Sequence, residues 1–338
     1  MKKIYLVTGA DGYLGNTIVK KLLKAGEKVR GLVLKKDQAI EVFKDFDSKN
    51  LELFEGDIRK IETLKAFFNV QDEKILIHTA AIVSIESAHI TKNVYDVNVN
   101  GLRNILDLAL KNNVKKMVHV ASVHAVPCKD KSVDVLKEIS FYDKEKVNGG
   151  YSKSKAIGAQ MCLDYVKKYD MDISICLPSG IFGPYDYNNS YLTQLIKDFS
   201  KKRIPLSINA KYNYVDVRDA AEGIINASKV GRKGGSYLLA GQIYTLNEIF
   251  TVLSEVLNMK KPKVAPKFIA YLGLPFIQLS AKIHKRRPLY TLYSLEVLRD
   301  NCNFCIDKAK SELGFTPRTI KESLMDEVDF LRNQGKIR

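Results

Sequence analysis

Few residues in this 338-residue sequence are of the types that mark secreted or metal-binding proteins. Its five cysteines form no even set for disulfide pairing, and free thiols are the default in a reducing compartment. Its five scattered histidines have no spacing that suits a metal ion. The first residues lead into a strand-like run without a signal-peptide pattern. We therefore expect a cytoplasmic protein without a metal site.

Internal repeats, low-complexity segments and nucleic-acid-binding motifs are also missing. Lysine and arginine together number 54 against 38 acids, which gives a net charge of +16. Such a balance favours anionic ligands, phosphorylated cofactors among them, or an acidic surface. Because the lysines are spread along the chain, we expect most of them on solvated helix faces, and we expect no nucleic-acid partner.

The longest apolar stretch, residues 264–283, falls short of the about 20 nearly uninterrupted apolar residues that a membrane-spanning helix needs. Lys267, Gly273 and Pro275 interrupt it. Helices that pack over a substrate pocket are the favoured interpretation. A membrane-surface contact through residues 264–287 is the alternative, because the basic run at 284–287 would suit anionic lipid.

In the first half of the chain, short β-rich runs alternate with longer helical patterns, as in a parallel sheet covered by helices on both faces. Strands are expected at residues 4–7, 28–34, 51–54, 75–78, 117–121 and 173–177, with helices at 94–110 and 151–169 among those between them. Gly9, Asp57, Ala80 and Ser122 follow four of these strands. Ligands bind at the carboxyl ends of the strands in such sheets, so we expect these four residues to share one site.

After Pro178 the pattern loosens into turn-rich sequence. Helices are expected at residues 191–201, 220–228 and 245–257 and from 319 onward, with a short strand-like run at 214–219. Thr245 with Glu248, and Thr319 with Glu322, have the spacing of a capping box, which marks the start of a helix.

Three glycines, Gly9, Gly12 and Gly15, lie between the first expected strand and a helix with apolar residues three and four apart. A glycine turn lets backbone N–H groups approach a pyrophosphate, and the helix N-terminus adds its positive dipole end. The G-x-x-G-x-x-G spacing differs from the commoner G-x-G-x-x-G, and glycines alone are weak evidence. Their place between strand and helix favours dinucleotide binding over a merely structural turn.

Tyr151 and Lys155 stand four residues apart, a spacing that puts both side chains on one face of a helix. A nearby cation favours the phenolate, so Lys155 is expected to lower the pKa of Tyr151. Tyr151 would then exchange a proton with a carbonyl or alcohol oxygen. A surface pair is the alternative for this spacing taken alone.

Three further features carry less weight. Cys302 and Cys305 form a single C-x-x-C pair, which lacks the other ligands of a zinc site and opens no thioredoxin-like unit. His78 is interpreted as a packed core residue. His124, two residues after Ser122, is a candidate for the border of the pocket.

The sequence resembles the extended short-chain dehydrogenase/reductase family over nearly its whole length. The motifs that carry the resemblance follow in the family's order: Thr8–Gly15, Gly56–Ile58, His78–Ala81, Asn98–Gly101, Ser122 with Tyr151 and Lys155, Leu177–Pro184 and Tyr214–Asp219. It implies a Rossmann α/β fold, a doubly wound parallel sheet with a smaller, mostly helical C-terminal substrate domain. It also implies a homodimer that packs through the helices of Asn98 and Tyr151. We divide the chain into an NAD(P)-binding domain, residues 1–178 with about 209–235, and a substrate domain, residues 179–208 with 236–338.

The resemblance also implies residue roles. Tyr151 would be the general acid/base, Lys155 would hold the nicotinamide ribose, and Ser122 would hydrogen-bond the substrate oxygen. Asn98 would support a water-linked proton path to the lysine. The cofactor would lie against the remaining residues: Gly9, Gly12, Tyr13, Leu14, Gly15, Asp57, Ile58, Ala80, Ala81 and Pro178. In one departure from the family, Ala121-Ser122-Val123 has a single hydroxyl residue where many members carry two or three.

The end of the second expected strand bears on the choice of cofactor. An acid there would suit the ribose 2′-hydroxyl of NAD, whereas a cation would suit the 2′-phosphate of NADP. In the stretch Val33–Asp37 no acid occurs before Asp37, and Lys35 and Lys36 occupy the tip. We predict NADP(H), with Lys35 as the first choice of phosphate ligand and Lys36 as the second. NAD(H) is the alternative, with both lysines in solvent.

Two reactions are compatible with these motifs. One is reduction of a ketone or aldehyde, or oxidation of the alcohol, of a small hydrophobic substrate. The other is a nucleotide-sugar epimerase or dehydratase with tightly bound NAD. The Pro178-Ser179-Gly180 segment resembles dihydroflavonol reductase-like and 3β-hydroxysteroid dehydrogenase-like members, and the apolar 264–283 stretch suits a hydrophobic substrate. Both observations favour the reductase, and the tyrosine–lysine pair argues against a non-catalytic dinucleotide sensor.

Overall fold

A computed structural model describes residues 3–44, 46, 48–84, 87–128, 133–283 and 300–338. Its centre is a seven-stranded sheet in which every neighbouring pair of strands is parallel. In sheet order the strands are β10 (Ser236–Leu239), β6 (Ile173–Pro178), β5 (Lys116–Val120), β4 (Glu73–His78), β1 (Lys3–Thr8), β2 (Lys28–Val33) and β3 (Leu51–Glu55). The chain order reverses at β1, between β2 and β4, and the predicted doubly wound fold is confirmed.

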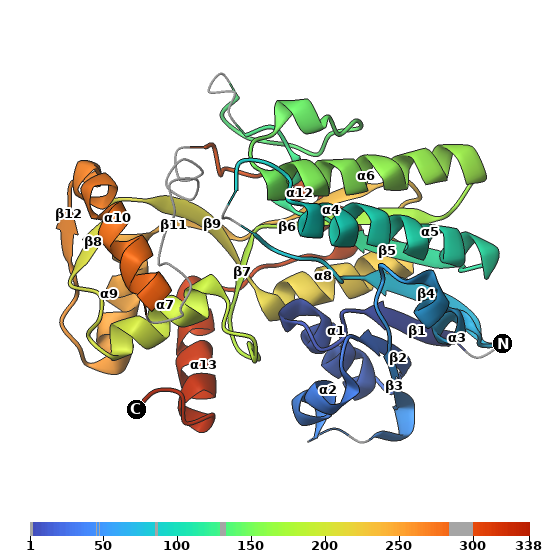
Figure 1. Cartoon of the computed structure of the whole chain (residues 1–338), viewed down its shortest axis with the longest axis horizontal. Helices are drawn as coiled ribbons and strands as arrows, with labels where there is room; N and C mark the ends of the chain where they lie inside the picture. The colour runs from blue at the N-terminus through green and yellow to red at the C-terminus, as the bar shows by residue number, and fades with distance from the viewer. Residues whose placement is uncertain (1–2, 45, 47, 85–86, 129–132, 284–299) are drawn as a thin grey trace.

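Helices cover both faces of this sheet, as Figure 1 shows. Side chains alternate between the faces along each strand. In β1, Leu6 packs with one layer, whose helices are α3 (Lys65–Phe68), α5 (Leu102–Lys111) and α6 (Gly150–Tyr169). Tyr5 and Val7 pack with the other layer, formed by α1 (Tyr13–Lys24), α2 (Lys36–Phe43), α8 (Val217–Val230) and α12 (Asp307–Leu313). The sheet is therefore buried on both sides, and its strand ends remain as the place for a ligand.

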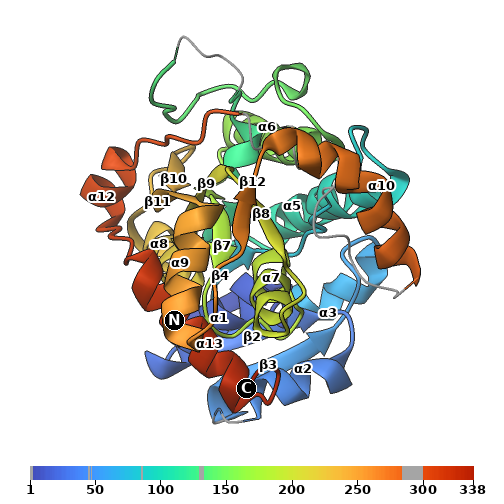
Figure 2. The same ribbon diagram turned by 90° about the vertical axis from the view of Figure 1, so that its left-hand side faces the viewer.

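A second group of elements lies beyond the carboxyl edge of the sheet and faces the viewer in Figure 2. Its core is formed by α7 (Tyr191–Ser200), α9 (Leu246–Leu257) and α13 (Ile320–Asn333). A three-stranded sheet joins β7 (Gly180–Phe182), β9 (Lys211–Asp216) and β11 (Gln242–Thr245). A two-stranded sheet pairs β8 (Leu206–Ile208) with β12 (Lys263–Ala265), which leads into α10 (Lys267–Ile283).

The six expected strands of the main sheet are present, with ends within two residues of the prediction. Both capping boxes are formed, at Thr245 with Glu248 and at Thr319 with Glu322. The seventh strand, β10, was not predicted. The division into domains stays a prediction, and β10, which that division put in the substrate domain, pairs with β6 in the main sheet.

Two sequence predictions need correction. The helix expected at 94–110 is divided into α4 (Lys92–Tyr95), a π-helical turn (Asp96–Gly101) and α5. Such π segments inside helices often occur at functional sites. The strand-like run expected at 214–219 ends at Asp216, because the Asp216 side chain accepts a hydrogen bond from the backbone N–H of Arg218 and caps α8.

None of the helices in the described part of the chain is long and apolar enough to span a bilayer.

Candidate active site

A cavity of about 1400 Å³ extends from the carboxyl ends of β1, β2, β4, β5 and β6 into the second group of elements. We call the part at the strand ends the cofactor half and the part among α7, β8, α9 and α10 the substrate half. Pockets for small ligands usually measure about 300–1,000 Å³. The volume therefore suits two molecules, one in each half.

The glycine turn between β1 and α1 forms one wall of the cofactor half. Gly9 has a φ of +64°, which favours glycine, and a Cβ there would lie 2.9 Å from the Cα of Ala80. A Cβ on Gly15 would lie 2.0 Å from the carbonyl oxygen of Gly9. Only glycine fits these two positions, so the backbone can approach a ligand closely.

The N-terminus of α1 opens into the same cleft. Gly12 is the N-cap residue and provides no side-chain cap, and the first turn contains no acid. Tyr13, Leu14 and Gly15 line the cavity at this point. The free N–H groups and the positive dipole end of the helix form a site for an anion. These features fit the pyrophosphate of a dinucleotide.

Residues after β3 line the far end of the cofactor half. Asp57, Ile58 and Arg59 lie there, and the predicted contact of the first two with the cofactor stays a prediction. The Arg59 guanidinium donates to both carboxylate oxygens of Asp57, at 2.7–3.0 Å, and these hydrogen bonds lower the pKa of Asp57. Sequence reasoning missed Arg59, although its place directly after the Gly56–Ile58 motif would have pointed to it.

The end of β2 contributes Leu32, Val33 and Leu34 to the cavity wall. Lys35 follows as the exposed N-cap residue of α2 and is not among the described residues that line the cavity. The N–H of Lys36 donates to a carboxylate oxygen of Glu55, 3.0 Å away. The structure therefore puts both lysines just outside the cavity rim.

Ala80 and Ala81, after β4, also line the cofactor half. Asn98 is buried behind them and is absent from the described cavity wall. Its amide oxygen accepts from the Ile82 N–H at 2.8 Å, and its amide nitrogen donates to the Ile82 carbonyl and to Ser154 Oγ, both at 3.0 Å. Asn98 thus fixes the segment around Ile82, which itself lines the cavity. Its predicted role in a proton path stays a prediction.

Tyr151, Lys155 and Ser122 meet on the cavity wall where the two halves join. Tyr151 and Lys155 lie one turn apart on α6, and Lys155 Nζ lies 5.9 Å from the centre of the Tyr151 ring. Lys155 Nζ donates to the carbonyl oxygen of Val120 at 2.9 Å. Burial lowers the pKa of Lys155 to about 8. The structure thus brings together Tyr151, the predicted general acid/base, with Lys155 and Ser122, whose predicted roles stay predictions.

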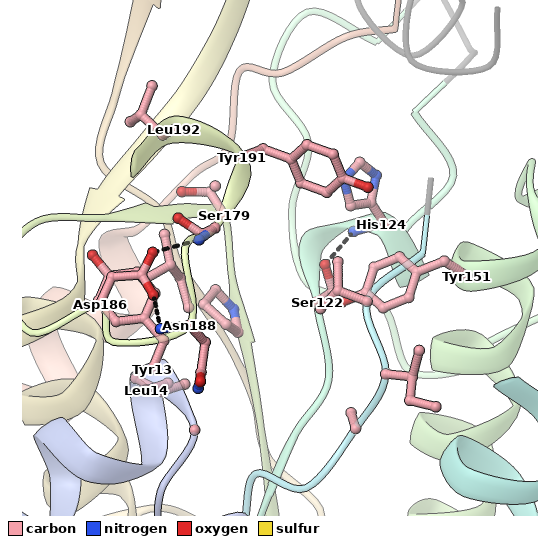
Figure 3. Close-up of a pocket in the computed structure, with 18 of the residues that line it drawn as sticks. Tyr13, Leu14, Ser122, His124, Tyr151, Ser179, Asp186, Asn188, Tyr191 and Leu192 are labelled. Atoms are coloured by element: carbon pink, nitrogen blue, oxygen red, sulfur yellow. Dashed lines mark hydrogen bonds between the residues drawn. The ribbon is translucent and has the colours of Figure 1, made fainter. Parts of the chain in front are cut away.

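His124 extends this group toward the substrate half. Figure 3 shows it beside Ser122 and Tyr151 on one side of the cavity. Its ring lies edge-on to Tyr151, with centroids 6.1 Å apart, and its Nε2 lies 2.7 Å from Tyr212 Oη. Burial lowers the pKa of His124 to about 4, so the imidazole is neutral near pH 7. Tyr212 was not predicted, because nothing in the sequence joins residues 124 and 212.

The opposite wall consists of Pro178, Tyr13 and the loop after β7. Tyr13 Oη donates to the carbonyl oxygen of Gly183, which fastens the glycine turn to that loop. Asp186, also missed in the sequence, lies on this side in Figure 3. Its carboxylate accepts from the Asn188 N–H at 2.9 Å and from the Ser190 N–H at 2.5 Å, so it shapes the loop.

The substrate half is predominantly apolar. Its walls come from α7, β8, α9, β12 and α10, at Leu192, Leu195, Ile204–Ile208, Leu246, Phe250, Ala265, Ile269 and Gly273. The last two confirm that part of the 264–283 stretch packs over a pocket. Arg203 is the one cation that the described residues contribute to this half, and it lies 3.4 Å from Asp198.

The residues set aside in the sequence lie away from this chemistry. His78 is buried at 2% exposure and hydrogen-bonds Thr8 Oγ1 at 2.7 Å, as a packed core residue. Cys302 is buried, and the Cys305 thiol donates to Asp307 at 3.3 Å. All five cysteines are free.

The parallel sheet, the glycine turn and the Tyr151–Lys155–Ser122 group define an NAD(P)-dependent oxidoreductase of the extended short-chain dehydrogenase/reductase class. The model of the NAD-dependent epimerase/dehydratase family matches residues 5–240, and the chain belongs to this family.

Individual relatives match along nearly the full chain. "Sterol demethylase protein B" of Methylococcus capsulatus is 27% identical over 336 residues, which cover 98% of this chain and 99% of the relative. A "putative dihydroflavonol 4-reductase" of Synechocystis is 28% identical and covers 100% of this chain and 97% of its own length. Among solved structures, that of gox2253 has a TM-score of 0.79 and 27% identity, with 99% of both chains covered.

Proposed function

We propose that this protein is an NADP(H)-dependent reductase of an apolar ketone or aldehyde, and that it also oxidises the corresponding secondary alcohol. The observation that carries the proposal is the position of Tyr151. It stands where a cavity half built for a dinucleotide meets a half lined by apolar side chains. The names of two relatives, a sterol demethylase protein and a dihydroflavonol reductase, support a fused-ring or aromatic substrate.

The residues present can perform each proton step of such a reduction. When bound, the nicotinamide supplies the hydride that the carbonyl carbon accepts. Ser122 Oγ orients the carbonyl oxygen by a hydrogen bond, and Tyr151 donates its phenolic proton to that oxygen. The Lys155 ammonium then stabilises the phenolate. The phenolate recovers a proton from solvent, which completes one turnover.

Against an epimerase or dehydratase stands the chemistry of the substrate half. A nucleotide sugar brings a diphosphate, which proteins usually bind with arginine, lysine or free backbone N–H groups. Arg203, the single cation that the described residues offer there, already faces Asp198. Apolar walls instead favour a substrate that gains free energy by leaving water, at about 25 cal/mol per Å² of buried apolar area.

The preference for NADP(H) is supported by the end of β2. Leu34 lines the cavity where an acid would bind the ribose 2′-hydroxyl of NAD, and Lys35, Lys36 and Arg59 lie around this end. We propose Lys35 as the ligand of the 2′-phosphate. Lys35→Ala should raise the KM for NADPH about tenfold, the equivalent of a charged hydrogen bond, and leave the KM for NADH unchanged. Lys111→Ala, at an exposed lysine on α5 outside the described cavity wall, is the control, and Lys36→Ala tests the second candidate.

The nucleotide released by the denatured, freshly purified protein tests the proposed reaction first. An empty protein, or one whose NADP(H) exchanges freely, agrees with a reductase and leads to a screen of apolar cyclic ketones by NADPH consumption. Stoichiometric NAD that survives dialysis would contradict the proposal. It would favour the epimerase or dehydratase and remove Lys35 as a phosphate ligand.

A further inference from the structure

Helix α10 presents apolar side chains in two directions. Ile269 and Gly273 line the substrate half of the cavity. Phe268, Leu272, Leu279 and Ile283 are exposed at 62%, 68%, 57% and 67%. At about 100° per residue these four lie within an arc of about 60° on one side of the helix. We call them the α10 strip.

One further exposed apolar side chain directly precedes the α10 strip in the chain. Val264 on β12 is exposed at 49%, whereas Leu206 on β8 lines the substrate half and pairs with Lys263, so it lies on the other face of the two-stranded sheet. The two strands pair with each other, and β12 leads directly into α10. Single exposed apolar residues are common on proteins, but a group of them on one side of a helix indicates an interaction site.

The charge of this region indicates what covers it. Residues 256–295 contain eight basic residues and no acid, in a chain that carries 38 acids in all. The basic residues are Lys260, Lys261, Lys263, Lys267, Lys282, Lys285, Arg286 and Arg287. Lys260, Lys261 and Lys263 are exposed on the segment that leads into the strip. These three exposed lysines therefore put positive charge on the segment directly before the apolar side chains.

This combination disfavours a second copy of the chain as the occupant. In a two-fold symmetric dimer the same surface of each copy faces the other, so the lysines of one copy would face those of its partner. Like charges held close together are repulsive. An anionic bilayer has the complementary properties, because its headgroups attract lysine while its acyl boundary accepts apolar side chains.

We propose that the α10 strip, with Val264 and the flanking lysines, is a docking surface for an anionic lipid bilayer. Helix α10 then lies in the plane of the interface, with Phe268 and Leu272 among the acyl chains and Lys260, Lys261 and Lys263 at the headgroups. The neighbouring face of the same helix lines the substrate half, so the cavity is held next to the membrane. The docking itself does not depend on the proposed reaction.

Vesicle co-sedimentation of the full-length protein tests the docking. The probes are vesicles of phosphatidylcholine alone and vesicles with about one third phosphatidylglycerol. We expect binding to the anionic vesicles at about 0.1 M salt and a marked loss at about 0.5 M, because salt screens the lysines. Absence of binding to the anionic vesicles at either salt concentration would overturn the proposal.

A pair of substitutions on the α10 strip, compared with a control pair elsewhere on the surface, tests whether the strip is the contact. Leu272→Asp with Leu279→Asp should lower the partition coefficient on anionic vesicles at least about tenfold, because two acids enter the apolar boundary. The control pair Ile40→Asp with Val230→Asp, also at exposed apolar positions and with the same change in charge, should lower it far less. Equal losses in the two pairs would contradict a specific surface.

The lysines give an independent test that leaves the apolar residues in place. Replacing Lys260, Lys261 and Lys263 by alanine should reduce binding to anionic vesicles about fivefold per lysine, and more than the same change at Lys111, Lys115 and Lys229. Light scattering measures the oligomeric state, and thermal melts measure the stability, of the leucine and the lysine variants. A dimer that dissociates in the Leu272/Leu279 variant, with vesicle binding unchanged, would identify a second copy as the occupant and overturn the proposal.

Discussion

The two halves of the cavity are built by different physical rules. In the cofactor half the backbone forms the contact surface. The fold there leaves no room for a side chain at Gly9 or Gly15. In the substrate half, apolar side chains from five separate elements form the surface, at Leu195 and Phe250 among others. The cofactor half selects its ligand by the fixed course of the backbone. The substrate half selects its ligand by the combined shape of many side chains.

This difference indicates where substitutions should have large effects. A side chain added in the cofactor half would clash with backbone that cannot move, and binding of the cofactor should be lost. A substitution in the substrate half contacts side chains that can change their conformation. It should therefore alter the preference among substrates by a smaller factor. Tyr151, at the junction, should affect the chemical step while leaving the binding in both halves intact.

The largest effect is expected at this junction. Tyr151→Phe should lower kcat about 10³-fold, because the proton donor is removed, and leave the dissociation constant of the cofactor within about twofold. Steady-state kinetics and fluorescence titration of NADPH measure the two quantities. Tyr191→Phe, elsewhere on the cavity wall, is the control. A Tyr151→Phe enzyme that kept more than about a tenth of its activity would show that another group transfers the proton.

A substitution in the glycine turn should act on the cofactor half alone. Gly9→Ala should weaken cofactor binding at least about tenfold, because its Cβ would lie 2.9 Å from the Ala80 Cα. Gly335 is a matched control, since it also has a φ of +64° and a Cβ there would meet nothing within 4 Å. Both variants carry the same strain of about 1–2 kcal/mol in left-handed backbone. Equal effects on cofactor affinity would contradict the steric account.

A substitution in the substrate half should do the opposite: it should weaken substrate binding and leave cofactor binding intact. Leu195→Asn should raise the KM for an apolar ketone about tenfold, because burial of a leucine side chain contributes about 1.5–3 kcal/mol. The affinity for the cofactor should stay unchanged. Leu110→Asn, outside the cavity and similarly half-buried, controls for general destabilisation. If Leu195→Asn weakened cofactor binding as much as substrate binding, the two halves would not be independent.

The smallest effect is expected on stability, from the buried lysine. Burial lowers the pKa of Lys155 to about 8 from its usual 10.5. Below pH 8 the lysine is charged in both the folded and the unfolded state, so the cost of burying the charge is complete. Between pH 8 and 10.5 the unfolded chain keeps the proton that the folded chain has released, so the cost falls as the pH rises.

Lys155→Met, which buries no charge, should therefore raise the melting temperature of the cofactor-free protein near pH 7, although it abolishes activity. The advantage of the variant over the parent should shrink as the pH rises from 8 to 10.5. Melting curves across this range measure the difference. A constant difference between pH 7 and 10.5 would contradict a lowered pKa for Lys155.

The cofactor half could be predicted from the sequence better than the substrate half, because its residues belong to local sequence patterns. Gly9, Asp57, Ala80 and Ser122 follow strands, and the sheet brings strand ends together; the Tyr151–Lys155 spacing is a local pattern within helix α6. Tyr212 reaches His124 through β9, 88 residues away in sequence, and no local pattern reports that contact. The short strands β8 and β12 likewise form only because they pair with each other over a long sequence separation.

One wrong prediction has a local cause. The π-helical turn at Asn98 has the apolar spacing of an ordinary helix, so periodicity cannot distinguish the two. Lys35 stays a prediction: its charge and its position after the second strand indicated it, and the structure puts Leu34 on the cavity wall and Lys35 next to it in the chain.

The most direct test of the central claim follows the hydride. The enzyme is supplied with NADPH that carries deuterium at the transferred position and with a ketone found in the screen, and the product is analysed by mass spectrometry. We expect one deuterium in each alcohol formed and an equal amount of NADPH oxidised. Product that lacks deuterium, formed while the nucleotide stays bound and unchanged, would contradict net reduction and would indicate an epimerase or dehydratase instead.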